Sequence, residues 1–164
     1  MLSTTSQYAL RALTFIAAHE GVEAVLGRRI AEKTGIPSNY LSKLLIELNN
    51  AGLVSASRGT GGGYRLAAPP SSITLNQVVG VFDPDVVNPC CLLGHSHLCS
   101  DETACSAHSV WKKTRAALTT FLNSTTLADI AGLKHARPKK KSQPKPKKKR
   151  SAAKPARQSG GRAR

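Results

Sequence analysis

The sequence predicts a mainly α-helical domain with one small β-hairpin, followed by a disordered basic tail. Three observations predict this. Apolar residues recur at helical spacing in several segments between residues 4 and 133. The glycine-rich stretch 58–64 separates two short strand-like segments, which is typical of a hairpin. Residues 134–164 consist of Lys, Arg, Pro, Ala, Ser, Gln, Gly and one His, a composition that buries too little apolar surface to fold.

The charge of the chain lies in the tail. The net charge is +15, but residues 1–133 contain 10 Lys and Arg against 9 Asp and Glu, whereas residues 134–164 contain 14 Lys and Arg and no acid. The folded domain, 1–133, is therefore nearly neutral. No apolar run approaches the roughly 20 residues of a membrane-spanning helix. Arg11 and Glu20 interrupt the N-terminal apolar pattern, which argues against a signal peptide. We therefore expect a cytoplasmic, nucleoid-associated protein.

The first three helices are predicted from periodicity and from helix-end signals. Residues 4–19 form the first helix, with Thr4 and Gln7 as a capping box. The second helix covers about 27–33. Gly35 then supplies a tight turn, and Ser38 caps the third helix. The core face of this third helix has the spacing i, i+3, i+4, i+7, and its members are Leu41, Leu44, Leu45 and Leu48.

The second half of the domain is predicted to contain the hairpin, two further helices and a long loop. The strands are expected at 53–58 and 64–67. Thr74 and Gln77 form a second capping box, which begins a helix with an apolar face. Residues 83–107 show no periodicity and contain all four cysteines, and a loop of this length tends to be functional. The last long helix covers 108–122. Its apolar stripe consists of Trp111, Thr114, Leu118, Phe121 and Leu122.

The order helix, turn, capped helix and glycine-rich hairpin indicates a winged helix-turn-helix in residues 1–68. The major groove admits one α-helix, and the first residues of the second helix of such a motif meet the base edges. For the third helix alone, a solvated surface helix is an equally good interpretation. The predicted contacts to double-stranded DNA are Arg28, Arg29, Ser38, Asn39, Tyr40, Ser42, Lys43, Arg58, Gly59, Thr60, Gly61 and Arg65.

The cysteine loop contains residue types that bind metal ions and iron–sulfur clusters. Its pattern is Cys91-x7-Cys99-x5-Cys105-x2-His108, with Cys90 directly before it. Thiolates suit both zinc and iron–sulfur centres. Structural zinc sites usually have more closely spaced pairs of cysteines. The spacing alone therefore leaves an iron–sulfur cluster, zinc and no cofactor open.

Several motifs together resemble the Rrf2 family of winged-helix transcriptional regulators, which includes iron–sulfur and nitric-oxide-sensing members. The matching stretches are YALRAL at 8–13, IAE at 30–32, GIPSNYL at 35–41, AGLV at 51–54, RGTGGGY at 58–64, CLLG at 91–94 and TTLADI at 125–130. The resemblance covers residues 1–133 and none of the tail. It implies a homodimer joined by the helices at 108–122, which would place two recognition helices on a pseudo-palindromic operator.

The resemblance also implies a ligand set. Cluster-binding members carry three loop cysteines, which match Cys91, Cys99 and Cys105. In one group of members the fourth ligand is a histidine three residues later, matching His108. In others it is an acidic residue on the first helix of the partner subunit, where this chain has Gln7. The resemblance therefore favours a 2Fe–2S cluster that senses redox, iron or nitric oxide status and orders the loop.

The tail and the alternative functions complete the predictions. The basic runs at 139–141 and 147–150 are expected to bind phosphates without reading sequence. The alternative is a solubilising extension. One alternative function is a regulator without a cluster that uses its cysteines as a thiol switch or a zinc site. Another is an architectural DNA-packaging protein dominated by the tail. No Ser/His/Asp or Cys/His pairing predicts an enzyme.

Overall fold

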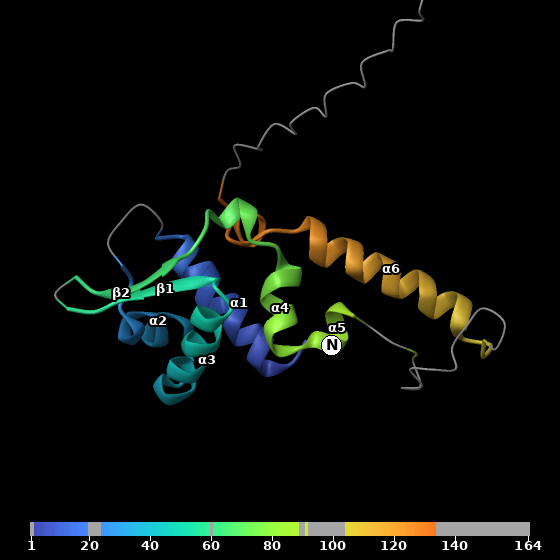
Figure 1. The fold of residues 1–164 in the computed structure, drawn as a ribbon, viewed down its shortest axis with the longest axis horizontal. Helices are drawn as coiled ribbons and strands as arrows, with labels where there is room; N and C mark the ends of the chain where they lie inside the picture. The colour runs from blue at the N-terminus through green and yellow to red at the C-terminus, as the bar shows by residue number, and fades with distance from the viewer. Residues whose placement is uncertain (1, 20–23, 60, 89–90, 92–103, 134–164) are drawn as a thin grey trace, which may run out of the picture.

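The computed structural model describes residues 2–19, 24–59, 61–88, 91 and 104–133. Within them, the helices and the hairpin follow one another along the chain, and α6 extends away from the other elements (Figure 1). The elements are α1 (Thr4–Ala17), α2 (Gly27–Thr34), α3 (Ser38–Asn50), β1 (Val54–Ser57), β2 (Gly63–Leu66), η1 (Pro70–Ser72), α4 (Leu75–Phe82), α5 (Pro84–Val87), α6 (His108–Ser124) and α7 (Leu127–Ile130).

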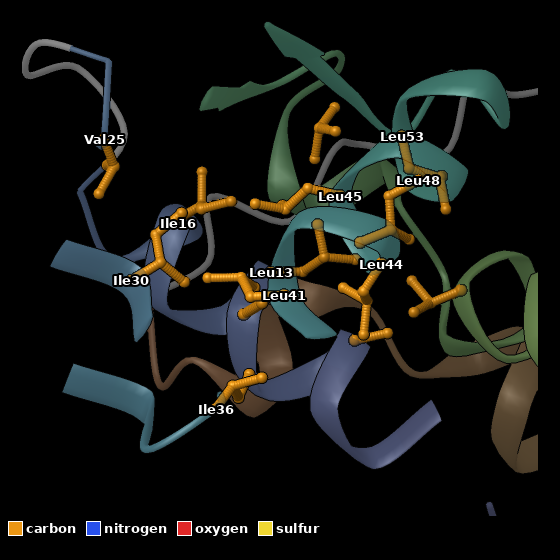
Figure 2. Close-up of a cluster of buried hydrophobic side chains, with 14 of the residues drawn as sticks. Leu13, Ile16, Val25, Ile30, Ile36, Leu41, Leu44, Leu45, Leu48 and Leu53 are labelled. Atoms are coloured by element: carbon orange, nitrogen blue, oxygen red, sulfur yellow. The ribbon is translucent and has the colours of Figure 1, made fainter. Parts of the chain in front are cut away.

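The main core lies between α1, α2 and α3. Leu13 of α1 and Ile30 of α2 are completely buried, and they meet the buried leucines of α3 (Figure 2). All four leucines predicted for the core face of α3 are buried. Helical spacing places them on one side of the helix, so the polar residues of α3 face outward. Ile36, also buried, anchors the turn between α2 and α3 in this core.

The hairpin pairs in antiparallel register, with Val54 opposite Leu66 and Ser57 opposite Gly63. Val25, which precedes α2, adds a bridge on the other side of β2. Its N–H and C=O both bond to the backbone of Tyr64, at 2.9 Å each. The wing is therefore joined to the segment that leads into α2, a connection that the sequence did not predict.

The C-terminal elements return to α1. Thr74 and Thr126 form a short antiparallel bridge. Both residues cap helices: the predicted capping box of Thr74 with Gln77 is confirmed, and Thr126 forms another with Asp129 at the start of α7. Leu127 is completely buried in the main core, so α7 packs against α1.

Helix α6 has little contact with its own domain. Of its 17 residues, only Leu122 is buried. Leu122 packs with Leu75 and Val79 of α4. Val110 and Phe121 of α6 are 66% and 53% exposed. No helix among the described residues has the length and apolar character needed to cross a membrane.

Several local predictions were wrong at helix ends. Ser3, not Thr4, caps α1: its hydroxyl accepts from the Ser6 N–H, and Gln7 instead donates to the Leu2 carbonyl. Helix α3 begins at Ser38, so Pro37 occupies the capping position and Ser38 caps nothing.

The predicted loop 83–107 and two helix ends also differ from the structure. The loop begins with the short helix α5, because Pro84 is well suited to the first position of a helix. Helix α1 ends two residues earlier than predicted, at Ala17, and α6 continues to Ser124. Each strand is shorter or shifted by one residue.

Candidate nucleic-acid interface

The turn between α2 and α3 fixes the angle of the recognition helix. Gly35 ends α2 in the left-handed conformation, with φ of 69°, and its N–H bonds to the Ala31 carbonyl at 2.9 Å. Residues with a β-carbon rarely adopt this conformation, so glycine is favoured here. Ile36 and the buried leucines of α3 then hold the helix against the core. Together, α2, the turn and α3 make the predicted helix-turn-helix.

The first turns of α3 present polar side chains to solvent. Ser38, Asn39, Ser42 and Lys43 are all exposed, as a DNA-reading face requires. The Ser42 hydroxyl donates to the Ser38 carbonyl at 3.0 Å, one turn earlier. This bond leaves the oxygen of Ser42 able to accept a further hydrogen bond. Asn39 and Lys43 carry the groups best suited to adenine and guanine edges.

Tyr40 differs from its neighbours on α3. Its hydroxyl shares a hydrogen bond with the hydroxyl of Thr5 on α1. Its ring meets the Tyr8 ring edge-on, with centroids 5.5 Å apart and an interplanar angle of 80°. The guanidinium of Arg11 lies 5.7 Å from the centroid of the Tyr8 ring. Sequence reasoning placed Tyr40 among the DNA contacts and missed these residues of α1, which lie some 30 positions away and share no periodic signal with it.

The two predicted arginines of α2 are exposed and already make weak contacts. Arg28 Nε donates to Glu32 Oε1 at 2.9 Å, one helical turn later. An exposed pair of this kind contributes only about 0.3–0.5 kcal/mol, so a phosphate can displace it. Arg29 lies 3.4 Å from the ring nitrogen Nε2 of His19 at the end of α1. Both guanidinium groups therefore remain accessible near the start of α2.

The wing carries two of the predicted cations. Arg58, Gly59, Gly61 and Arg65 are exposed, whereas Thr60, also a predicted contact, lies outside the described residues. The hairpin, α2 and α3 are gathered at one end of the molecule, with α6 extending from the other (Figure 1). The structure thus brings the predicted contacts of α2, α3 and the wing to the same part of the fold.

Two wing glycines allow close backbone approaches. A β-carbon on Gly62 would lie 2.5 Å from the Ser57 carbonyl oxygen. A β-carbon on Gly63 would lie 2.7 Å from the Val25 carbonyl oxygen, beside the bridge that joins Val25 to the wing. Both distances are shorter than any side chain tolerates. The run of glycines is thus required by the tight hairpin and by its attachment to Val25.

The structure describes only part of the predicted ligand set. Cys91 is half-buried, Cys105 is exposed, and His108 is the first residue of α6. The His108 N–H donates to the Cys105 carbonyl at 3.0 Å, so these two residues lie within one turn. Cys90 and Cys99 lie outside the described residues. Among the residues that the structure does describe, no three His, Cys, Asp or Glu side chains gather as a metal site.

Known proteins resemble this chain over most of its length. Residues 2–132 match the Rrf2 family, described as an iron-dependent transcriptional regulator. The transcriptional regulator IscR of Vibrio vulnificus strain YJ016 is 35% identical over 129 residues, which cover 79% of this chain and 76% of the relative. The solved structure of CymR, the global cysteine regulator of B. subtilis, has a TM-score of 0.69 at 29% identity and covers 82% of this chain and 98% of that one. IscR of T. potens has a TM-score of 0.65 at 32% identity, with coverages of 80% and 86%.

Proposed function

Because the chain belongs to the Rrf2 family of DNA-binding transcriptional regulators, we propose that it binds a pseudo-palindromic operator as a homodimer. The observation that carries this proposal is the exposed polar face of α3, held by a buried face of four leucines and flanked by a glycine-rich wing. The relatives are transcriptional regulators and not enzymes. Such a regulator would work in the cytoplasm, at the nucleoid.

The proposed contacts divide by chemistry into base readers and backbone binders. Asn39 and Lys43, on the exposed face of α3, would read base edges in the major groove, and Ser38 and Ser42 would support them. Arg28 and Arg29 at the start of α2 would bind phosphates. Phosphate contacts set register and affinity without reading sequence. In the wing, the same role would fall to Arg58, Gly59, Thr60, Gly61 and Arg65.

The homodimer is supported by the exposed apolar residues of α6. A 17-residue helix with one buried side chain gains little from packing on its own domain. Val110 and Phe121 are exposed on it. Pairing with a second copy of α6 would bury them, and a two-fold axis would place two α3 helices on two half-sites.

Substitutions in α3 and in the wing test the DNA proposal. Lys43→Ala is expected to weaken binding to the operator by about tenfold or more and to relax preference at one base pair per half-site. Arg58→Ala is expected to weaken binding equally to all sequences and to flatten the salt dependence. Lys113→Ala, an exposed cation on α6, is the matched control. The measurement is titration of a duplex that the full chain selects from random DNA; selection of no sequence would refute the proposal.

We also propose that Cys91, Cys99, Cys105 and His108 hold a 2Fe–2S cluster that modulates operator binding. Three thiolates and one imidazole are ligands that such clusters accept. The one-turn separation of Cys105 and His108 is compatible with both binding the same centre. A bound cluster would supply a redox-sensitive centre, and its oxidation or loss would change operator affinity. The ligand residues would fix the loop when they hold the cluster, and the loop would set the helix angles in the dimer.

Two cysteines of the same loop, Cys99 and Cys90, provide a test variant and its control for the cluster proposal. Cys99→Ala should abolish the visible iron–sulfur absorbance of anaerobically purified protein and its iron content. Cys90→Ala, which removes a thiol without a place in the ligand set, should leave both unchanged. Retention of the absorbance and of normal DNA binding in Cys99→Ala would contradict the proposal.

A second candidate function is a regulator that uses its cysteines as a thiol switch or a zinc site. The observation that favours it is the likeness to CymR, the global cysteine regulator of B. subtilis. Metal analysis of the anaerobically prepared protein separates the candidates, because iron with sulfide, zinc, and no metal are three different results. Architectural packaging dominated by the tail would instead produce uniform coating of DNA without a footprint.

The tail, residues 134–164, lies outside the described residues and is proposed to bind phosphates non-specifically. Its 14 Lys and Arg on a nearly neutral domain would account for most of the salt dependence. Deletion of the tail should weaken non-specific binding and flatten its salt slope, while operator preference survives. An unchanged slope would favour the solubilising role.

A further inference from the structure

Tyr40 is the one aromatic residue on α3. Its hydroxyl is engaged by Thr5, and its ring by the edge of Tyr8. Both partners belong to the first two turns of α1. Although Tyr40 is 38% exposed, a side chain whose hydroxyl is bonded and whose ring packs on a neighbouring ring is less suited to reading a base than to fixing the helix that bears it.

The first turn of α1 is itself held from the opposite side. The Ser3 N–H donates to Asp83 Oδ2 at 2.8 Å, across 80 positions of sequence. Asp83 is the residue at which α4 ends and α5 begins, and α5 leads toward Cys91. A carboxylate that accepts a backbone N–H forms a charge-assisted bond, which is stronger than a neutral one. The same helical turn therefore contacts both the recognition helix and the start of the cysteine-bearing segment.

We propose that Tyr40 is a positioning residue, and that the first turns of α1 link the segment after Asp83 to the recognition helix through Thr5 and Tyr8. The link has two joints: Asp83 with Ser3, and Thr5 with Tyr40. Movement at the first joint shifts α1, and the second joint passes that shift to the N-terminal turn of α3. This inference rests on the proposed DNA-binding function for its consequence, but its geometry is independent of it.

The hydrogen bond between Thr5 and Tyr40 can be removed from either side, and this distinguishes a positioning role of Tyr40 from base reading. Tyr40→Phe keeps the ring contact with Tyr8 and removes only the hydroxyl bond. Thr5→Val removes the same bond from the other partner, while leaving every atom of α3 in place. If Tyr40 reads a base, the two substitutions have different effects. If Tyr40 is a positioning residue, they have the same effect and do not add, because each removes the one bond.

The DNA measurement is a double-substitution cycle in the full chain. Tyr40→Phe and Thr5→Val are each expected to weaken operator binding by roughly two- to tenfold, and the double variant by no more than either alone. Base preference should stay unchanged. Thr4→Val, an exposed threonine in the same turn, is the matched control and should bind normally. The positioning role would be overturned if the affinity loss of the double variant equalled the product of the two single losses, or if Tyr40→Phe alone altered base preference.

The first joint is tested without DNA, by the resonances of the three tyrosines in protein labelled with ¹³C at tyrosine. Asp83→Asn is expected to shift the signals of Tyr8 and Tyr40 and to leave that of Tyr64, in the wing, unchanged. Asp85→Asn, an exposed neighbour on α5, is the control and should shift none of them. Unmoved Tyr8 and Tyr40 signals in Asp83→Asn would refute the link. Because this readout needs no operator, its failure is distinct from failure of the proposed DNA binding.

Discussion

The two ends of this fold differ in how much of their packing comes from their own chain. At one end, α1, α2 and α3 bury a continuous core that includes Leu13, Ile30 and Leu45, and the wing is attached to that core through Val25. At the other end, α6 buries only Leu122 and leaves Phe121 exposed. The DNA-reading end buries its core within one chain, whereas all of α6 except Leu122 stays partly or fully exposed.

This difference suggests a division of roles. A rigid helix-turn-helix holds Asn39 and Lys43 in fixed positions, so recognition of DNA does not depend on rebuilding the reader. In the proposed function, the α6 end would be completed by a second copy and by a bound centre. Regulation would then act on the relation between the two readers and, through α1, on the position of α3 in each, which together determine whether both half-sites are occupied at once.

The largest effect is expected from the core of the DNA-reading end. Leu45→Ala should lower the free energy of unfolding by about 2–5 kcal/mol, because it leaves a cavity among fully buried side chains. Ile46→Ala, on the next position of the same helix but 57% exposed, is the control and should change it by less than about 0.5 kcal/mol. Urea unfolding at fixed protein concentration measures both. Equal losses would mean that α3 is not held by its leucine face.

The next effect is expected at the α6 end, where it should depend on protein concentration. Phe121→Ser is expected to raise the dimer dissociation constant by about tenfold or more, since it removes exposed apolar area that the proposed pairing would bury. Asn123→Ala, an exposed polar position on the same helix, is the control. Sedimentation across a concentration series gives both constants. A monomeric wild-type chain, or an unaltered constant in Phe121→Ser, would contradict pairing through α6.

Much of the DNA-reading end could be predicted from sequence, because its signals are local. The spacing of the leucines in α3 determines its buried face, and Gly35 marks a turn that requires a positive φ. The helix caps were less predictable. Ser3 and Thr4 are both good caps, and the choice depends on Asp83, which binds the Ser3 N–H from a distant part of the chain.

Contacts between distant segments account for the remaining differences. Nothing in the local sequence indicates that Val25 pairs with Tyr64, or that Tyr40 bonds to Thr5. The first contact joins the segment before α2 to the wing, and the second joins α1 to α3. The short helix α5 was missed because four residues are too few to show a period. The predicted DNA contacts and cluster ligands remain predictions.

The smallest expected effect concerns Asp83, which lies between α4 and α5 and binds the backbone just before α1. Burial raises the pKa of this carboxyl, but the Ser3 N–H, the hydroxyls of Ser6 and Ser3 and the positive chain terminus together outweigh that effect. The Ser6 hydroxyl is buried and has no hydrogen-bond partner of ordinary geometry, but it lies close enough to Asp83 to contribute to the lowering. The net pKa is below its ordinary value. A depressed pKa in the folded state means that the carboxylate stabilises the fold at neutral pH, and that this stabilisation is lost as the pH falls below about 4.

Asp83→Asn should therefore lower the free energy of unfolding by about 1 kcal/mol or less at pH 7. The difference from the wild type should shrink as the pH falls through the acid range, because the wild-type carboxylate becomes protonated while the amide does not titrate. Asp85→Asn, an exposed carboxyl on α5, should have little effect at any pH. Thermal unfolding from pH 3 to 7 measures all three proteins. A constant difference between Asp83→Asn and the wild type would show that Asp83 acts through its shape and not through its charge, and the joint between α4 and α1 would then not depend on pH.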